Sequence, residues 1–265
     1  MPNPIAIFDH KRALLHKARA ARNAAAHDFL FAEMEARIAE RLGEIKRRFE
    51  KPFEISGRPE RIDKRFLQDE WLQDPRFRGD VNYDLITSAG GLHWVNDLPG
   101  VLAQIQRLLT PDGCFIAILP GGETLKELRQ SLEQAELALR GGISPRVSPF
   151  IDVRDAGGLL QRAGFALPVV DSEMLTIEYD HPLKLLADLR GMGETNALVS
   201  SAKHFTPRRV MMAAMEHYQQ HFANEAGRVV ATIQLVTLTG WKPHASQQQP
   251  AKRGSGKVNL RDALG

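Results

Sequence analysis

The order of apolar and polar residues predicts alternating strands and helices in the middle of the chain. Residues 83–88 form a short apolar run bounded by polar residues, which is typical of a buried parallel strand. A helix should follow over residues 97–109, where apolar residues recur at a spacing of three and four. A second apolar strand over 114–119 and a second helix over 123–140 complete the pattern.

This strand-helix-strand-helix order has a consequence for where ligands bind. Short connections between such elements produce right-handed crossovers and a parallel sheet. Ligands of parallel sheets bind beyond the carboxyl ends of the strands. Those ends carry residues 88–97 and 120–124, so a functional site is expected there.

The N-terminal region is predicted to be helical and to precede the main domain. Residues 1–27 are rich in Ala, Arg and Lys, which indicates either a mitochondrial presequence or a basic helix. Residues 28–47 have the spacing of an amphipathic helix, expected to pack on the sheet edge. We predict N-terminal helices over 1–50, an α/β domain with cap insertions over 51–242, and a flexible polar tail over 243–265.

The stretch before residue 83 contains a further strand and a glycine turn. Residues 52–57 read as a strand ending in Gly57, and a helix can begin at Pro59. A strand, a glycine turn and a helix N-terminus can form a cradle for a phosphate or carboxylate. A plain strand-to-helix turn is the alternative.

The C-terminal half contains two glycine-rich loops. The loop at 141–150 has two Gly and two Pro residues, which can hold Arg146 rigidly over a site or can serve only as a crossover. The second loop covers residues 191–196. The remaining predicted elements are helices over 153–163, 181–189 and 207–225, and strands over 167–179 and 229–241.

Composition excludes several classes of protein. The chain is 43% hydrophobic with a net charge of +3, which is too small to argue for nucleic-acid binding. The single cysteine, Cys114, falls within a predicted strand, so a buried reduced thiol is expected and a disulfide framework is excluded. No apolar run approaches the roughly 18 residues of a membrane span.

The candidate chemistry is concentrated at the predicted strand ends. The sequence contains no metal-binding histidine pair on a helix, no nucleophile elbow and no Gly-Lys-Ser/Thr phosphate loop. What remains is His93, Trp94 and Asp97 at one strand end and Glu123 at the next. His93 could accept a proton or bind a cofactor. Alternatively, Trp94 plugs the sheet edge and His93 hydrogen-bonds the backbone.

Several motifs follow one another in the order found in one known family. They are Ile7-Phe8-Asp9, Ser88-x4-His93-Trp94-Val95-Asn96-Asp97-Leu98-Pro99, Leu109-x-Pro111-Asp112-Gly113, Gly121-Gly122-x-Thr124-Leu125, Gly142-x-Ser144-Pro145-x-x-Ser148-Pro149-Phe150, Gly191-Met192-Gly193-Glu194-x-Asn196 and Gly240-Trp241-Lys242-x-His244. Together they resemble the methyltransferase-fold assembly factor of respiratory complex I. Bacterial relatives of that factor are often called class I S-adenosylmethionine (SAM)-dependent methyltransferases.

The resemblance implies a fold, a partner and a set of site residues. The implied fold is α/β and Rossmann-like, and the mitochondrial family member hydroxylates an arginine of a complex I subunit. The implied catalytic residues are His93, Trp94, Asp97 and Glu123, and the implied partner-facing residues are Ser144, Arg146, Glu194 and Asn196. Because the match begins at residue 7, we expect no removable presequence and a cytoplasmic location.

The SAM-binding loop departs from the family pattern. The family reads Asp-Leu-Gly-x-x-x-Gly, whereas residues 54–60 read Glu-Ile-Ser-Gly-Arg-Pro-Glu. The residues that correspond to the cofactor site are Glu54, Ser56, Gly57, Asp63 and Ser88. With a side chain and a proline in the loop, we predict SAM binding of roughly millimolar affinity or weaker. Arg58 could partly compensate by pairing with the methionine carboxylate.

The spacing predicts that the N-terminal half of the sheet is truncated. One strand-helix-strand unit needs roughly 30 residues, and the family fold needs several such units between residues 53 and 83. Either the first strand connects almost directly to the strand at 83, or the middle strands are vestigial. In the second case Asp63 could replace the ribose-binding acid.

Three functions remain open from the sequence. The first is a SAM-dependent methyltransferase-family enzyme that modifies an arginine of a complex I subunit. The second is a non-catalytic assembly or scaffold protein that has lost SAM. The third is a methyltransferase acting on a small molecule or carrier protein, like that of biotin synthesis.

Overall fold

The strands form one sheet in which parallel and antiparallel pairs are combined. In the computed structural model, which describes residues 6–62, 82–202 and 205–248, the strand order is β1-β2-β3-β5-β4. The strands are β1 (Pro52–Glu54), β2 (Tyr83–Ala89), β3 (Leu109–Pro120), β4 (Ala166–Tyr179) and β5 (Val229–Trp241). β1, β2 and β3 are parallel, and β5 is antiparallel to both of its neighbours. The predicted parallel pairing of the two central strands is confirmed.

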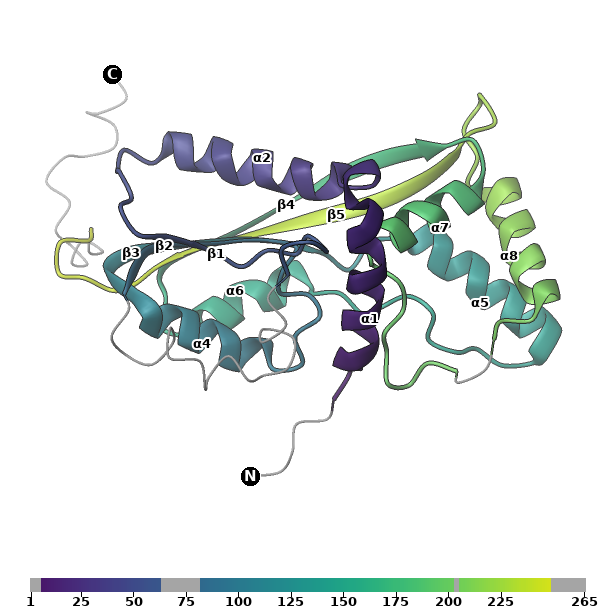
Figure 1. Cartoon of the computed structure of the whole chain (residues 1–265), viewed down its shortest axis with the longest axis horizontal. Coiled ribbons are helices and arrows are strands. Elements are labelled where there is room, and N and C mark those ends of the chain that lie inside the picture. Colours follow the sequence, from purple (N-terminus) through teal and green to yellow (C-terminus); the bar gives the residue numbers. More distant parts are fainter. Residues whose placement is uncertain (1–5, 63–81, 203–204, 249–265) are drawn as a thin grey trace, which may run out of the picture.

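Helices cover both faces of this sheet (Figure 1). They are α1 (His10–Ala20), the 3₁₀ helix η1 (Ala21–Ala26), α2 (Phe29–Glu44), α4 (Leu98–Leu108), α5 (Lys126–Arg140), α6 (Val153–Arg162), α7 (Pro182–Gly191) and α8 (Arg208–His221). Asp97 caps α4 by accepting a hydrogen bond from the Gly100 N–H, with Pro99 in the first turn. Gly141, at a φ of +68°, ends α5. Among the described helices, none is both long and apolar enough to cross a lipid bilayer.

The hydrophobic core lies in two layers, one on each face of the sheet. On one face α2, α5 and α8 pack against β2, β3 and β5, and on the other α4 and α6 pack against the same strands. The helix predicted over 28–47 therefore packs on a face rather than on the edge, because Leu30, Phe31, Met34 and Ile38 are buried against the sheet. Cys114 is buried as expected, and burial raises the pKa of its thiol to about 12.

The N-terminal part of the described sheet ends at β1. β1 pairs directly with β2, with Phe53 opposite Ile86. Residues 63–81, which include Asp63 and most of the helix predicted from Pro59, lie outside the described residues. Among the described strands β1 has β2 as its sole neighbour, which agrees with the predicted truncation of this half of the sheet.

The carboxyl ends of β1 and β2 are in direct contact through glycines. A Cβ atom on Gly57 would lie 2.1 Å from the Gly90 carbonyl oxygen, and one on Gly91 would lie 2.4 Å from the Ile55 carbonyl oxygen. The Gly57 N–H also donates to the Ala89 carbonyl, at 3.0 Å. Backbone atoms on both sides leave no room for a side chain here.

We therefore expect Gly57→Ala to destabilise the fold by more than about 2 kcal/mol, because backbone must move to admit the methyl group. Gly43→Ala is the matched control, since a Cβ at Gly43 in α2 meets nothing within 4 Å. The control should be stabilising by up to about 1 kcal/mol through helix propensity. Urea denaturation of both variants measures the difference, and equal stabilities would contradict the contact.

Candidate functional site

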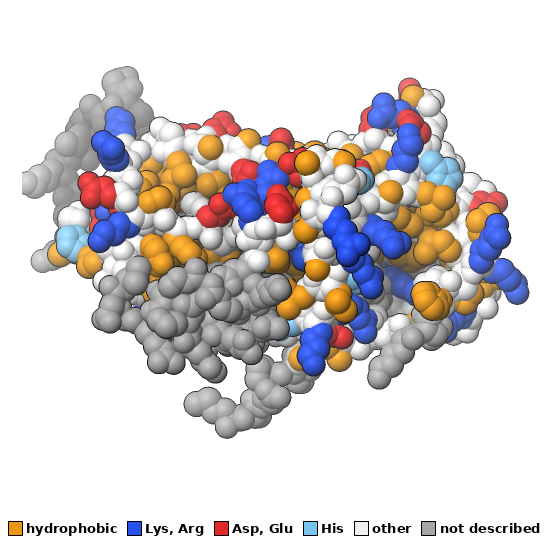
Figure 2. Space-filling view, in the orientation of Figure 1, with side chains coloured by type: hydrophobic (Ala, Val, Ile, Leu, Met, Phe, Trp, Pro, Cys, Tyr) orange, Lys and Arg blue, Asp and Glu red, His pale blue; other side chains and the backbone are white. Residues whose placement is uncertain are grey.

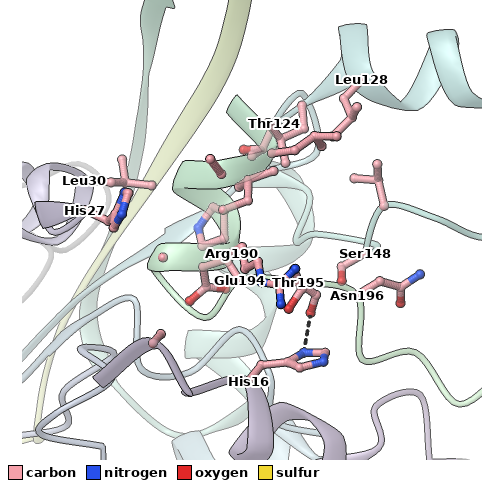
Figure 3. A pocket seen from close by; sticks show the side chains of 18 of the residues that line it. His16, His27, Leu30, Thr124, Leu128, Ser148, Arg190, Glu194, Thr195 and Asn196 are labelled. Atoms are coloured by element: carbon pink, nitrogen blue, oxygen red, sulfur yellow. Dashed lines mark hydrogen bonds between the residues drawn. The ribbon is translucent and has the colours of Figure 1, made fainter. Parts of the chain in front are cut away.

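A cavity of about 1070 Å³ opens at the carboxyl ends of β2 and β3. Gly90 and Pro120, at those two strand ends, form part of its wall. The other walls include residues of α1, η1, α2, α5, α7, α8 and β5 and of the loops at 144–150 and 191–196. Figure 3 shows His16 and Thr195 on one side of this cavity and Thr124 and Leu128 on the other. The cavity therefore lies at the strand ends where a functional site is expected.

The carboxylate of Glu194 joins three segments that are distant in the sequence. Its Oε2 atom accepts a hydrogen bond from Trp94 Nε1 at 2.9 Å and lies 2.7 Å from His93 Nε2. Its Oε1 atom pairs with the Lys17 ammonium of α1. Lys17 also donates to the carbonyl of Gly57 at 2.8 Å and to that of Met192 at 3.3 Å.

The surroundings hold Glu194 in its charged form. Burial by itself would raise the pKa of this carboxyl, but the neighbouring His93 and Lys17 outweigh that effect and lower it well below the usual value of 4.5. The Lys17 side chain is only 1% exposed, so its ammonium depends on Glu194 and the two carbonyls for compensation.

His93 keeps one ring nitrogen unpaired. Its side chain is 8% exposed and lines the cavity, and Nδ1 is buried without a hydrogen-bond partner among the described residues. Hydrogen bonding of Nε2 to a carboxylate places a proton on Nε2, so in the neutral ring Nδ1 is an acceptor. Such an acceptor can take a proton or a hydrogen bond from a ligand.

Trp94 and Asn96 connect the strand end to the N-terminal motif. The Trp94 ring packs edge-on against Phe8, with centroids 5.2 Å apart. Asn96 Oδ1 accepts from the Ile7 and Phe8 N–H groups, both at 2.8 Å. Trp94 is 3% exposed, as expected if it plugs the edge of the sheet. His93, by contrast, contacts the Glu194 carboxylate and not the backbone group that the alternative predicted.

Two of the predicted catalytic residues lie away from this centre. Asp97 is the N-cap of α4, and Glu123 pairs with Lys126 at 3.2 Å with its side chain 54% exposed. Neither is among the residues that line the cavity. The structure therefore unites His93, Trp94 and Glu194 but places Asp97 and Glu123 elsewhere.

The predicted partner-facing residues hold the two glycine-rich loops together. Asn196 Nδ2 donates to the Pro145 carbonyl at 3.0 Å. The Glu136 carboxylate of α5 accepts from the Ser144 N–H at 2.6 Å and from Arg146 Nε at 2.9 Å. Burial would raise the pKa of Glu136, but Ser144 and Arg146 lower it. Arg146 lines the cavity with its charge already balanced by Glu136.

The described residues at the expected SAM position do not fit SAM, because their polar groups are used internally. Glu54 pairs with Arg61 at 3.0 Å, and Ser88 Oγ donates to the Ile55 carbonyl at 2.9 Å. Ser56 Oγ accepts from the Arg58 N–H at 3.3 Å. Both backbone groups of Gly57 are also bonded, to Ala89 and to Lys17. Asp63 lies outside the described residues.

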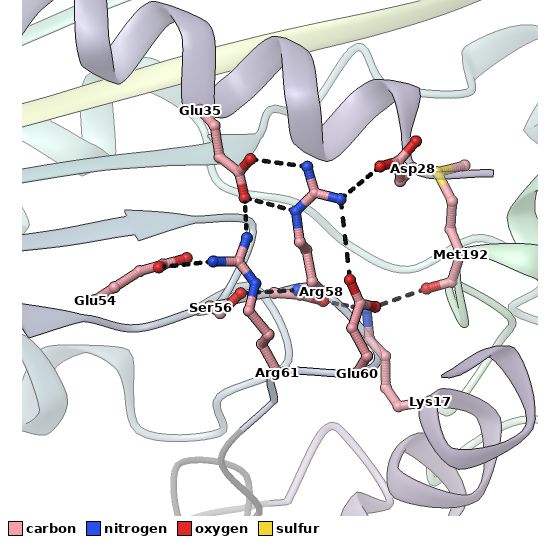
Figure 4. Close-up of polar contacts among 10 residues, drawn as sticks. Lys17, Asp28, Glu35, Glu54, Ser56, Arg58, Glu60, Arg61 and Met192 are labelled. Carbon is pink, nitrogen blue, oxygen red and sulfur yellow. Dashed lines mark hydrogen bonds and ion pairs between the residues drawn. The ribbon is translucent and has the colours of Figure 1, made fainter. Parts of the chain in front are cut away.

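Arg58 is likewise committed to contacts within the protein (Figure 4). Its guanidinium makes two hydrogen bonds to Glu35, at 2.6 and 2.7 Å, and one to Asp28 at 2.7 Å. These contacts keep the pKa of Arg58 above its usual value, with the Glu35 bond as the main cause. The expectation that Arg58 could pair with a methionine carboxylate is therefore wrong, since bidentate contact with α2 uses the same donors.

Lys17 is a residue of this centre that the sequence did not single out. The basic composition of residues 1–27 predicts only a presequence or a basic helix. In α1 Lys17 shares a buried face with Ala13 and Ala20. A single lysine at helical spacing within a stripe of small apolar residues is the signal that could have revealed it.

The chain has relatives among known proteins. Residues 5–168 match the methyltransferase domain family. The chain is 37% identical to arginine-hydroxylase NDUFAF5, mitochondrial, from Danio rerio, over 97% of this chain and 89% of that protein. The Homo sapiens protein of the same name is 38% identical, over 98% and 84%. The malonyl-[acyl-carrier protein] O-methyltransferase of Nitrosospira multiformis is 33% identical, over 60% of this chain and 49% of that protein.

A solved structure was also found. The YcgJ protein of Bacillus subtilis superposes with a TM-score of 0.46 and 13% identity, covering 78% of this chain and 97% of that one.

The matched domain and the sheet order define the class of protein: a class I SAM-dependent methyltransferase-type α/β fold. Within that class, the chain belongs to the NDUFAF5 arginine-hydroxylase family. The Danio rerio alignment runs over 286 residues, which exceeds the 265 residues of this chain. The relative thus contains residues without a counterpart in this chain.

We expect Glu194→Gln to destabilise the protein by about 3 kcal/mol near neutral pH, because it leaves the buried Lys17 charge uncompensated. The folded-state pKa of Glu194 is depressed, so its contribution is present above the usual value of 4.5 and is lost as pH falls. The gap between wild type and variant should therefore narrow below pH 4.5. Denaturation curves across pH measure it.

Glu123→Gln is the matched control, because the Glu123–Lys126 pair is exposed and should contribute less than about 1 kcal/mol. Equal losses for the two variants at every pH would contradict the role of Glu194.

Proposed function

We propose that this chain is a complex I assembly protein that binds a complex I subunit at the cavity mouth and does not use SAM at the family position. The observation that carries the proposal is the Glu194 centre, where Lys17, His93 and Trp94 converge. The motifs shared with the family meet around this centre. By contrast, the polar groups of the described residues at the expected cofactor position make contacts within the protein.

In the enzymatic form of this proposal, the target is an arginine of the subunit, as the names of the relatives suggest. His93 Nδ1 would accept a hydrogen bond from the target side chain, and Glu194 would orient the ring and stabilise its charged form. Trp94 and Lys17 position Glu194. We expect the protein to act in the cytoplasm, without nucleic acid as a partner.

The second candidate is a scaffold that assembles without chemistry. The contact of Gly57 with Gly90 and the engagement of Arg58 favour it, because both close the end of the sheet where the family binds its cofactor. A methyltransferase acting on a carrier protein requires SAM, so a measurement of SAM binding separates it from both other candidates.

His93→Ala should leave the protein folded and abolish complex I assembly or target modification in cells if the enzymatic form is right. In this variant Glu194 keeps its contacts with Lys17 and Trp94, so we expect the lost His93 contact to cost about 2 kcal/mol and the protein to remain folded. His221→Ala, at an exposed position at the end of α8, is the control and should complement fully. If folded His93→Ala complements fully and mass spectrometry shows that the target arginine is unmodified, the scaffold form is favoured and the enzymatic form is contradicted.

Calorimetric titration of the purified chain with SAM should show a dissociation constant of about 1 mM or weaker. A micromolar dissociation constant corresponds to a binding free energy of about −8 kcal/mol. Loss of one ribose contact and of part of the loop should weaken this binding free energy by several kcal/mol. A dissociation constant near micromolar would overturn the SAM part of the proposal and restore the methyltransferase candidates.

A photo-crosslinking residue at position 205 should capture the complex I subunit. Phe205 lines the cavity and is 98% exposed, so it lies at the mouth. The same residue at position 174 of β4 is the control, because Met174 is 52% exposed but does not line the cavity. Capture from position 174 alone would place the partner on a different surface.

A further inference from the structure

The charges around the cavity are unbalanced at its mouth. Arg19 and Arg190 line the opening, are exposed, and form no ion pair within the described part of the chain. Arg146 is balanced by Glu136. Glu194 is the only carboxylate among the described lining residues, and it already pairs with Lys17. Two cationic groups thus remain for a ligand.

The same face of the molecule is cationic over a wider area. Lys and Arg side chains gather over α1 and the neighbouring α7, with few acidic side chains beside them (Figure 2). His16 of α1 also lines the cavity, and burial together with the charges of Arg19 and Arg12 lowers its pKa. Burial is the main cause of this lowering, and the two arginines add to it.

Behind the mouth, the cavity wall is apolar. Leu128 and Leu132 of α5, Leu189 of α7 and Met211 of α8 line it. Both α5 leucines are less than 7% exposed, so this wall belongs to the core of the protein. An apolar wall behind a cationic opening matches a molecule with an apolar body and an anionic end.

A residue of the cavity wall also carries a buried polar atom. His93 lines the cavity with a side chain that is 8% exposed, and its Nδ1 atom has no partner among the described residues. Buried polar atoms in native proteins are nearly always hydrogen-bonded. The cavity of about 1070 Å³ lies at the upper end of the size range of ligand sites.

We propose that the cavity binds a small amphiphilic carboxylate, with the carboxylate between Arg19 and Arg190 and the apolar body against α5, α7 and α8. This ligand is distinct from the complex I subunit and from SAM. The ligand would occupy the cavity into which the enzymatic form of the proposed function directs a target side chain, so the two would compete. The binding test below uses neither the subunit nor SAM, so its failure is distinguishable from failure of the function proposed above.

Dodecanoate below its micellar concentration is the probe, titrated calorimetrically into the full chain. One dodecanoate should bind per chain. Dodecyltrimethylammonium, which has the same tail but a positive charge, and acetate, which has the carboxylate but no tail, should not bind at the same concentrations. Equal binding of the cationic surfactant would overturn the proposal, because it would show apolar adsorption without a carboxylate site. Absence of dodecanoate binding would overturn it as well.

Matched variants test the two ends of the site. Arg19→Gln and Arg190→Gln should each weaken dodecanoate about tenfold through loss of a charge-assisted contact. Arg22→Gln should not, since Arg22 does not line the cavity. Met211→Gln should weaken binding, while Met212→Gln, at a residue 60% exposed and outside the lining, should not. Thermal melting confirms that each variant is folded, and unchanged affinity in both arginine variants would refute the site.

Discussion

The buried carboxylate of Glu194 is the interaction on which the arrangement of the site depends. It connects the N-terminal helix α1, the loop after β2 and the loop after α7 through Lys17, His93 and Trp94. Burying charges costs free energy that their attraction repays only in good geometry. Here the remaining donors of Lys17 reach two backbone carbonyls, so the charge is satisfied from several directions and the ring of His93 is fixed relative to the cavity.

A second consequence of the Lys17 contacts concerns the end of the sheet where β1 stops. Lys17 bonds the carbonyl of Gly57, and Gly57 packs against Gly90 with no space for a side chain. Arg58, the next residue, is held by Glu35 and Asp28 of the α2 region. The chain thus uses internal cation contacts where the family motif uses open glycine backbone. The adjoining cavity at the ends of β2 and β3 stays open, with a volume of about 1070 Å³.

Several features followed from the sequence alone because they depend on local physics. The central strands are continuous apolar runs that exclude water on both faces, and the helices between them carry a repeat and caps such as Asp97. Because the carboxyl ends of parallel strands meet at one edge of a sheet, the sequence also predicts that His93 and Trp94 lie at that edge, and both line the cavity there. The sequence also shows that the cofactor loop departs from the family pattern, since a side chain at Ser56 and a ring at Pro59 replace open backbone.

What only the tertiary structure decided are the long-range pairings of charged residues. Lys17 and Glu194 are separated by most of the chain, and neither periodicity nor spacing relates them. Arg146 was expected to face a partner, yet its charge is balanced by Glu136, and Arg58 is held by α2 rather than open to a ligand. An exposed and a buried arginine have the same local sequence signature, because the energy of a charge is set by the groups that the fold brings within a few ångströms of it. The sequence therefore determined the central strands and helices, and the packing of α1, α2 and α5 determined which charges remain available at the cavity.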